Sequence, residues 1–326
     1  MSKPTILVIG SLNTDLITRT SRIPAPGETL TSQSFDTGSG GKGANQAVAC
    51  ARLSRRRDAV EQGDVLVRMV GAVGDDIFGH DLVGGLKQDG IDTNGVELKK
   101  GEKTGVSTII VEEQTGENRI LFSPNANYTL QPKNFTSLQE PLPDVIVLQL
   151  EIPLDTVLQV LKTAHEKGVQ VVFNPAPAIP LPDEAYRCIT HLIVNESEAA
   201  ILSGNDSGQA PQPEAVHRIA DHFRFLGVKN IIVTLGSRGV VYSGNSGMYE
   251  DLPAEKADVV DTTAAGDTFV GAYAVEVARH VGKGGEFDVA KAVKLANSAA
   301  AKTVEKRGAQ AAIPWMDEVS TYHIGL

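Results

Sequence analysis

The sequence predicts an α/β fold, with a central mostly parallel β-sheet flanked by helices and a small β-sheet lid. Short apolar runs alternate with helical patterns through most of the 326 residues, as expected when helices connect parallel strands. These runs are continuously apolar, which is typical of strands buried on both faces. Two other segments alternate polar and apolar residues around turn sequences, and they predict a separate small sheet.

The predicted α/β domain covers residues 1–12, 39–96 and 124–326, and the predicted lid covers residues 13–38 and 97–123. The domain strands are expected at residues 6–9, 65–70, 145–148, 169–173, 192–194 and 231–234. Its helices are expected at residues 44–53, 77–88, 154–167, 215–226, 269–281 and 289–303. The polar stretches 54–64 and 203–214 predict surface insertions. An exposed lid edge makes the lid a candidate dimer surface.

Charge and composition exclude several functions. Forty acidic residues against 30 basic ones give a net charge of −10, which argues against nucleic acid or an anionic membrane as the main partner. The apolar run at residues 4–10 is too short for a signal peptide or a membrane span. The basic cluster at residues 55–57 predicts a solvated loop. We expect a cytoplasmic protein, with the nucleus as a second compartment.

The strongest functional pattern is DTTAAGDTF at residues 261–269. Its small residues let the backbone approach a ligand closely. The first N–H groups of the helix that follows have no partner of their own and favour an anion, above all a phosphate. Asp267 would repel that anion unless it faces a second substrate and accepts a proton from the attacking hydroxyl. The alternative is an ordinary helix start with an acid in its first turn.

The glycine run GSGGKG at residues 38–43 satisfies the dinucleotide-binding pattern, but the preceding residues are polar and form no buried strand. A dehydrogenase is therefore disfavoured, and no Walker-type nucleotide motif occurs in the chain. The run fits better as a close approach of backbone to a ligand. Gly41 supplies that approach, while Lys42 and Asn45 supply polar side chains where the next helix begins.

Polar side chains also follow two predicted strands. Asn13 and Asp15 lie just beyond the first strand, at the end where α/β sheets bind ligands, and their spacing places them on one face. Glu151 follows another strand end. Each residue alone fits a satisfied loop group, but together they favour a ligand that carries several hydroxyl groups.

Two further strand ends suit a nucleotide. Asn195 and Glu198 open a helix, and their spacing fits either a capping box or a water shell around Mg²⁺ on ATP phosphates. Both readings remain open. The glycine-rich turn TLGSRG at residues 234–239 can follow a triphosphate.

Together these motifs resemble the phosphofructokinase-B-type carbohydrate kinase family over nearly the whole chain. The resemblance rests on GSLNTD (10–15), PGET (26–29), GGKGANQA (40–47), NPAP (174–177), NESE (195–198), TLGSRG (234–239) and DTTAAGDTF (261–269). The last motif marks the family, and residues 40–47 are more specific to its ribose-phosphorylating members.

The resemblance implies a role for each matching position. Asp267 would be the base, with the backbone of Ala264, Ala265 and Gly266 as the anion hole. The sugar would be bound by Asn13, Asp15, Gly41, Lys42, Asn45, Glu151 and Asp267. The nucleotide would lie against Asn195, Thr234, Gly236 and Asn297, with Mg²⁺ held through water by Asn195 and Glu198. A K⁺ site would fall on Asp261, Thr263, Thr303, Lys306, Gly308 and Ala312, mostly through carbonyl groups.

Three positions depart from the family pattern. Ala312 stands where serine is usual, Thr263 replaces a residue that is often aliphatic, and residues 124–127 (PNAN) replace a glycine-containing turn. The Ala312 departure puts one K⁺ contact in doubt.

The resemblance implies ATP-dependent phosphorylation of D-ribose at its 5-hydroxyl, giving D-ribose 5-phosphate and ADP, and the exposed lid edge favours a homodimer. The rivals are a fructose, ketodeoxygluconate or nucleoside kinase and a non-catalytic sugar sensor. Asp15 disfavours acidic sugars, and an aromatic content of 5% disfavours a stacked nucleoside. Asp267 and its anion-binding turn disfavour the sensor.

Overall fold

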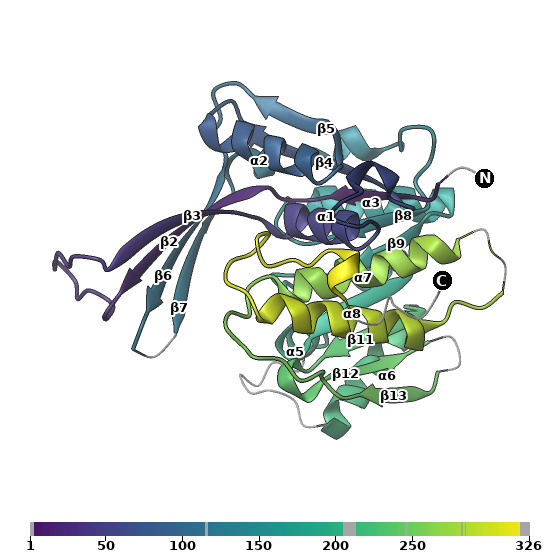
Figure 1. The fold of residues 1–326 in the computed structure, drawn as a ribbon. Coiled ribbons are helices and arrows are strands. Elements are labelled where there is room, and N and C mark those ends of the chain that lie inside the picture. Colours follow the sequence, from purple (N-terminus) through teal and green to yellow (C-terminus); the bar gives the residue numbers. More distant parts are fainter. Residues whose placement is uncertain are drawn as a thin grey trace.

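The computed structural model describes residues 3–114, 117–204, 213–244, 247–281, 283 and 285–319. Most of the insertion expected at residues 203–214, and the middle of the turn at residues 114–117, lie outside this part of the chain. The described residues form an α/β body from which a narrow sheet projects (Figure 1). This confirms the predicted fold class.

The body is built on one large sheet, for which the described residues supply nine strands. They are β1 (Thr5–Ile9), β4 (Leu66–Gly74), β5 (Asp92–Lys99), β8 (Val145–Leu148), β9 (Gln170–Phe173), β10 (His191–Asn195), β11 (Asn230–Thr234), β12 (Val240–Ser243) and β13 (Tyr249–Leu252). Their order across the sheet is β13-β12-β11-β10-β9-β8-β1-β4-β5. Pairing is parallel from β11 to β5 and antiparallel at β12 and β13.

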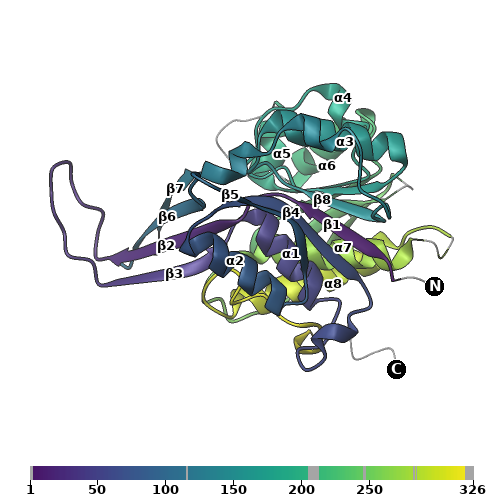
Figure 2. The same ribbon diagram turned by 90° about the horizontal axis from the view of Figure 1, so that it is seen from above.

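Helices cover both faces of this sheet, as Figure 2 shows from above. They are α1 (Lys42–Arg52), α2 (Ile77–Gln88), α3 (Leu154–Lys167), α4 (Asp183–Tyr186), α5 (Glu196–Leu202), α6 (Pro213–Phe225), α7 (Ala265–His280) and α8 (Val289–Val304). Short 3-10 segments lie at Val60–Gln62, Asn125–Thr129, Pro132–Phe135, Gly236–Arg238 and Met316–Glu318.

The two helical layers bury separate hydrophobic cores. Alternate residues of β1 point to opposite faces, so Val8 packs in the core under α1, α7 and α8, while Ile9 packs in the core under α3 and α6. Helix α7 is buried nearly all round because it lies between α1 and α8 (Figure 1). An element held on all sides is a rigid support for a functional group at its first turn.

The parallel register places several strand ends at one edge of the sheet. Ile9 of β1 is opposite Leu148 of β8, and Asn195 of β10 is opposite Thr234 of β11. The residues that follow these strands therefore meet at the carboxyl edge, where α/β sheets bind ligands.

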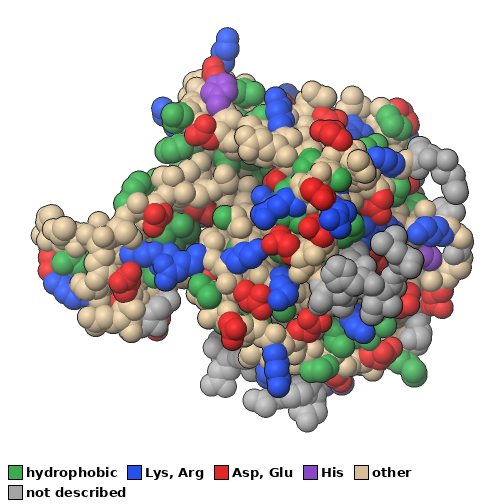
Figure 3. All heavy atoms as spheres, in the orientation of Figure 1, with side chains coloured by type: hydrophobic (Ala, Val, Ile, Leu, Met, Phe, Trp, Pro, Cys, Tyr) green, Lys and Arg blue, Asp and Glu red, His purple; other side chains and the backbone are tan. Residues whose placement is uncertain are grey.

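The lid is a separate sheet in which the described residues supply four strands, in the order β3-β2-β6-β7. They are β2 (Asn13–Thr20), β3 (Ser34–Gly40), β6 (Gly105–Glu112) and β7 (Asn118–Ser123). The lid projects from the body beside the carboxyl edge (Figure 1). Figure 3 shows charged side chains of both signs intermingled on the face of the body in view.

The structure differs from the sequence prediction in three places. Strand β5 belongs to the large sheet and runs to Lys99, and lid strand β3 runs to Gly40, so the sheets meet a few residues away from the expected boundaries. The strands β5, β12 and β13 had not been expected, because they are short or half-exposed and lack a continuous apolar run.

The third difference is Arg55, which was expected on a solvated loop and is instead buried. Its guanidinium donates to the carbonyl oxygens of Val65, Asp89 and Gly90. Five donors in one plane can bond several carbonyls at once, and these bonds offset the cost of burying the charge.

Candidate active site

Asp267 lies in the first turn of α7 and is 7% exposed. Its Oδ2 accepts a hydrogen bond from Asn45 Nδ2 at 2.9 Å, and its Oδ1 accepts one from Gln46 Nε2 at 2.9 Å. Both donors come from α1, which packs against α7. The carboxylate is thus held in a fixed orientation at the carboxyl edge of the sheet.

The turn before α7 brings backbone amides toward the same place. Ala264 has a φ of 61°, a left-handed conformation that is uncommon for a residue with a Cβ and often marks a functional site. A Cβ added to Gly266 would meet no atom within 4 Å, so open space lies beside its backbone. The amide of Ala265 makes a long contact of 3.3 Å with the carbonyl of Thr262. The turn has the open space and the helix N-terminus that an anion needs.

Glu151 contacts two other residues expected on the sugar side, Asn13 and Lys42, together with Ser11. Its Oε2 accepts hydrogen bonds from Ser11 Oγ at 2.6 Å, Asn13 Nδ2 at 3.3 Å and the backbone N–H of Lys42 at 3.0 Å. Because these donors belong to the link after β1, the start of β2 and the start of α1, the carboxylate ties the lid strand to the body. The structure therefore brings Asn13, Lys42 and Glu151 together.

Asp15 lies next to this cluster, against the backbone of Gly40, where an added Cβ would meet Asp15 Oδ2 at 2.3 Å. Burial, together with the charges of Glu151 and Asp267, raises the pKa of Asp15 to about 6 despite a hydrogen bond from Ser107. Gly41 has a φ of 86°, and a Cβ there would meet the backbone N of Asn13 at 2.6 Å. Glycine is thus required where α1 meets the lid strand.

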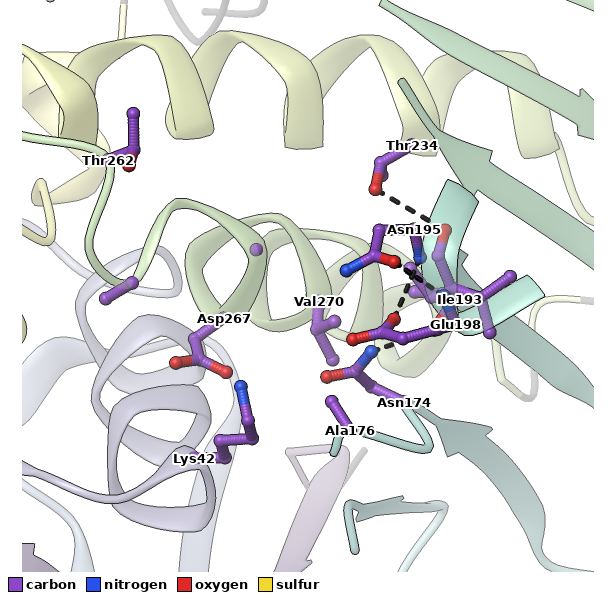
Figure 4. Close-up of a pocket in the computed structure, with 13 residues that line it drawn as sticks. Lys42, Asn174, Ala176, Ile193, Asn195, Glu198, Thr234, Thr262, Asp267 and Val270 are labelled. Atoms are coloured by element: carbon purple, nitrogen blue, oxygen red, sulfur yellow. Dashed lines mark hydrogen bonds between the residues drawn. The ribbon is translucent and has the colours of Figure 1, made fainter. Parts of the chain in front are cut away.

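A cavity of about 240 Å³ opens beside Asp267. The side chains of Lys42 and Asp267 point toward each other on one side of it, and Asn174, Asn195 and Glu198 lie on the other (Figure 4). Burial by itself would lower the pKa of Lys42, but the neighbouring carboxylates, Asp267 foremost, outweigh it and raise that pKa. Lys42 is therefore a half-buried cation, and its side chain faces the cavity beside Asp267.

Asn195 and Glu198 form the capping box that was one of the two alternatives. Asn195 Oδ1 accepts from the Glu198 backbone N–H at 2.8 Å, and Glu198 Oε2 accepts from the Asn195 backbone N–H at 2.8 Å. Both side chains also line the smaller cavity. Burial raises the pKa of Glu198, against the opposing effects of the Asn195 hydrogen bond and the Lys42 charge. The capping role thus leaves a carboxyl oxygen, Glu198 Oε1, outside the box.

A second cavity, of about 670 Å³, adjoins the first, and Thr234, Thr262 and Gly266 line both. Gly236 and Asn297 line the larger cavity, where Asn297 Nδ2 donates to the carbonyl of Pro253 at 2.9 Å. Its wall includes apolar groups from α8 and from residues 254–259, which suits a flat base and a ribosyl group. The positions expected on the nucleotide side therefore share one continuous hollow.

The positions expected to hold K⁺ come from two segments joined by Asp261. Its Oδ1 accepts from the backbone N–H of Thr263 at 2.9 Å, and its Oδ2 accepts from the backbone N–H of Gly308 at 2.9 Å. Partial burial works to raise the pKa of Asp261, but these hydrogen bonds outweigh it and hold the pKa below its usual value. Asp261 thus links the two segments through an ionised carboxylate, and carboxylate oxygens are hard donors of the kind that bind such a cation.

At three other positions of this set the side chain is engaged elsewhere or offers no oxygen. Thr303 Oγ1 donates to Ala299 O at 3.1 Å and accepts from the Thr268 hydroxyl at 2.8 Å, so its hydroxyl is engaged between α7 and α8. Lys306 Nζ pairs with Glu318 at 2.8 Å. Ala312 is fully buried and offers no side-chain oxygen.

Sequence reasoning missed Asn127. This buried side chain accepts from the Leu12 backbone N–H at 2.9 Å and donates to Asn13 Oδ1 at 2.8 Å, so it orients Asn13 toward Glu151. Asn125, in the turn that departs from the family pattern, has a φ of 47°. Asparagine tolerates this conformation better than most residues, which explains how the turn forms without the usual glycine.

Comparisons with known proteins agree with this geometry. Residues 3–316 match the pfkB family carbohydrate kinases. A curated relative named "Ribokinase" from Schizosaccharomyces pombe is 42% identical over 319 residues, which cover 96% of each chain. Another, named "Deoxyribokinase", from Salmonella typhi, is 37% identical over 97% of this chain and 98% of its own. A solved structure of Arabidopsis thaliana ribokinase complexed with ribose and ATP has a TM-score of 0.84, 27% identity and full coverage of both chains. With a matching fold, matching length and an acid at the start of α7 beside two joined cavities, the chain belongs to the pfkB family of carbohydrate kinases.

Proposed function

We propose that the protein transfers the γ-phosphoryl group of ATP to the 5-hydroxyl of D-ribose, giving D-ribose 5-phosphate and ADP. The observation that carries this function is the place of Asp267. It lies at the N-terminus of α7, between the carboxylate and amide cluster around Glu151 on one side and the two cavities on the other. The S. pombe relative and the Arabidopsis structure support ribose and ATP as the substrates.

The geometry supplies each step of an in-line transfer. Asp267 accepts the proton of the sugar hydroxyl, whose oxygen then attacks the γ-phosphorus as ADP leaves. The N-terminus of α7 and the Lys42 ammonium lie where negative charge develops on the transferred group. Asn45 Oδ1 is buried and has no hydrogen-bond partner within the described chain, so it is available to accept from a sugar hydroxyl.

Two metal ions belong to this proposal. Mg²⁺ would be held through water by Asn195 and Glu198, whose oxygens line the smaller cavity, and it would neutralise phosphate charge. K⁺ would bind at Asp261, Thr263, Thr303, Lys306, Gly308 and Ala312, and it would fix the turn that leads into Ala264–Gly266. Without a cation, Asp261 and the facing carbonyl groups would repel one another.

We also propose that the lid forms a homodimer contact. Phe35, Ile120 and Leu121 are lid residues that are 60%, 56% and 68% exposed, and apolar side chains on open strands favour pairing with a second copy. None of the described helices is long and apolar enough to cross a bilayer, and the cytoplasm remains our proposed compartment.

The test is a sugar panel with ATP in which ADP release and the phosphorylated product are both measured. The panel holds ribose, 2-deoxyribose, fructose, ketodeoxygluconate and a nucleoside. The second candidate acceptor is 2-deoxyribose, because the Salmonella relative is named for it. We expect the highest kcat/KM on ribose. A higher value on any other sugar would reject ribose as the substrate, and binding without turnover on every sugar would favour the sensor.

A further inference from the structure

Gln46 is a buried α1 residue to which neither the family pattern nor the cavities assign a role. It is 0% exposed and lines neither cavity. Its Nε2 donates to Asp267 Oδ1 at 2.9 Å and to Asn174 Oδ1 at 3.1 Å, and its Oε1 accepts from Gln149 Nε2 at 2.6 Å. Gln46 therefore reaches the reaction only through Asp267.

The hydrogen-bond partners leave the Gln46 amide a single orientation. Asn174 Nδ2 donates to the carbonyl of Ile193 at 2.9 Å, which turns Asn174 Oδ1 toward Gln46. A reversed Gln46 amide would place its oxygen against two acceptors, Asp267 Oδ1 and Asn174 Oδ1, and its nitrogen against the Gln149 donor. Gln149 could turn together with Gln46, because Gln149 Oε1 has no partner in the described chain, but the bonds to Asp267 and Asn174 would both be lost in a buried place, where each unpaired group is costly.

The second donor to Asp267 is held differently. Asn45 Nδ2 donates to Oδ2, but Asn45 Oδ1 has no hydrogen-bond partner in the part of the chain described. Turning the Asn45 amide would break only its bond to Asp267 among the bonds described, whereas turning the Gln46 amide would also break its bond to Asn174. Asp267 Oδ1 therefore keeps its hydrogen bond to Gln46, whereas Asp267 Oδ2 can exchange its bond to Asn45 for one to a ligand.

We propose that Gln46 is a positioning residue for Asp267, and that Gln149 and Asn174 hold its amide in the working orientation. The inference rests on the proposed function, because it makes Oδ2 the atom that accepts the hydroxyl proton. The sugar O–H bond breaks as an O–H bond forms on Oδ2, the sugar oxygen bonds to the γ-phosphorus, and ADP leaves with the electron pair of the broken P–O bond. Gln46 keeps Oδ1 engaged throughout, so that Oδ2 faces the hydroxyl.

The test replaces the amide with an apolar side chain of similar length. In Gln46→Met we expect kcat to fall by about 10- to 100-fold, which is the rate factor that corresponds to the free energy of a hydrogen bond to a charged group. The KM values for ribose and ATP should stay within about twofold, because Gln46 contacts neither substrate. Gln149→Met removes only the group that orients Gln46 and should lower kcat by a smaller factor.

A double-mutant cycle separates positioning from a general packing role. In an Asp267→Ala background, Gln46→Met should leave the residual kcat unchanged, because the group it positions is gone. Gln159→Met is the matched control, since Gln159 bonds only the side chain of Thr163 on α3, and its kcat should equal that of the wild type. An equal fold-loss with and without Asp267, or a wild-type kcat in both Gln46→Met and Gln149→Met, would overturn the proposal.

The wild type is assayed first on the sugar panel, and that result decides the proposed function by itself. The variants are then compared on the sugar that the wild type turns over best, so a substrate other than ribose leaves the positioning test intact. A crystal structure of Gln46→Met gives a readout that needs no activity. We expect the Asp267 carboxylate to rotate there, and an unmoved carboxylate would contradict the proposal.

Discussion

Asp267→Asn tests the proposed base, and its effect on stability can be derived from the contacts of the Asp267 carboxylate. The change replaces one oxygen with an NH₂ group, which must face either Gln46 Nε2 or Asn45 Nδ2, both of which are donors. The Gln46 amide is held in its orientation by Asn174 Oδ1, because Asn174 Nδ2 donates to the carbonyl of Ile193. Asn45 can reverse and present its buried, unpartnered Oδ1 to the new NH₂. We therefore expect the variant to fold, with its stability within about 1 kcal/mol of the wild type.

The catalytic loss should be far larger than this stability change. Removing a positioned base lowers turnover by on the order of 10² to 10⁴, or about 2.7 to 5.4 kcal/mol at 1.36 kcal/mol per tenfold. ATP affinity should be unchanged. Ribose affinity should fall modestly, because the reversed Asn45 would offer the sugar an N–H group in place of an oxygen.

The measurements are kcat from ADP release at saturating substrates, ribose and ATP affinities by calorimetry, and a thermal melt. Asp155→Asn is the matched control, because Asp155 is an exposed acid in the first turn of α3 and should leave kcat unchanged. A kcat for Asp267→Asn within about tenfold of the wild type, in folded protein, would refute the role of Asp267 as the base. A large loss of stability would refute the reversal of Asn45.

Three further predictions concern the sugar site and the cation. Asp15→Ala should weaken ribose binding by about 1.5 to 3 kcal/mol and leave ATP binding unchanged in calorimetry, because a charged hydrogen bond is lost. Because the pKa of Asp15 is raised to about 6, its carboxylate is ionised above that pH. The ribose affinity of the wild type should therefore fall as the pH drops through this value. An affinity independent of pH would contradict the assignment of Asp15 to the sugar site. Gly41→Ala should lower the free energy of unfolding by more than about 1 kcal/mol in a denaturant titration, because its Cβ would meet backbone atoms at a positive φ. Gly38→Ala is the control, because a Cβ at Gly38 meets no atom within 4 Å. Potassium should raise the kinase activity more than sodium does. Ala312→Ser should lower the half-activating potassium concentration, because it adds a hydroxyl ligand. An activity in a large inert cation equal to that in potassium would rule out the site.

The fold class followed from the sequence because its signals are local. A strand buried on both faces must be apolar along its length, as β1 and β8 are, and this requirement does not depend on which strands lie beside it. The small residues before Asp267 likewise predicted an anion-binding turn, because close approach and a free helix N-terminus are properties of a few neighbouring residues. Strand β13 gave no such signal, since it lies at the edge of the sheet and needs no continuous apolar run, and strand β12 is only four residues long.

Tertiary structure alone decided what surrounds each charge. Gln46 and Gln149 are 103 positions apart, and Gln46 and Asp267 are 221 apart, so the amide chain behind the carboxylate exists only after α1, β8 and α7 have packed. Arg55 belongs to a basic run that looked solvated, yet its burial depends on carbonyl groups that other segments bring to it. The sequence by itself determined which residues could carry the chemistry, because their types and local turns are encoded in short motifs. Which atoms of those residues face one another was decided by packing, because hydrogen-bond geometry depends on the relative placement of elements far apart in the chain.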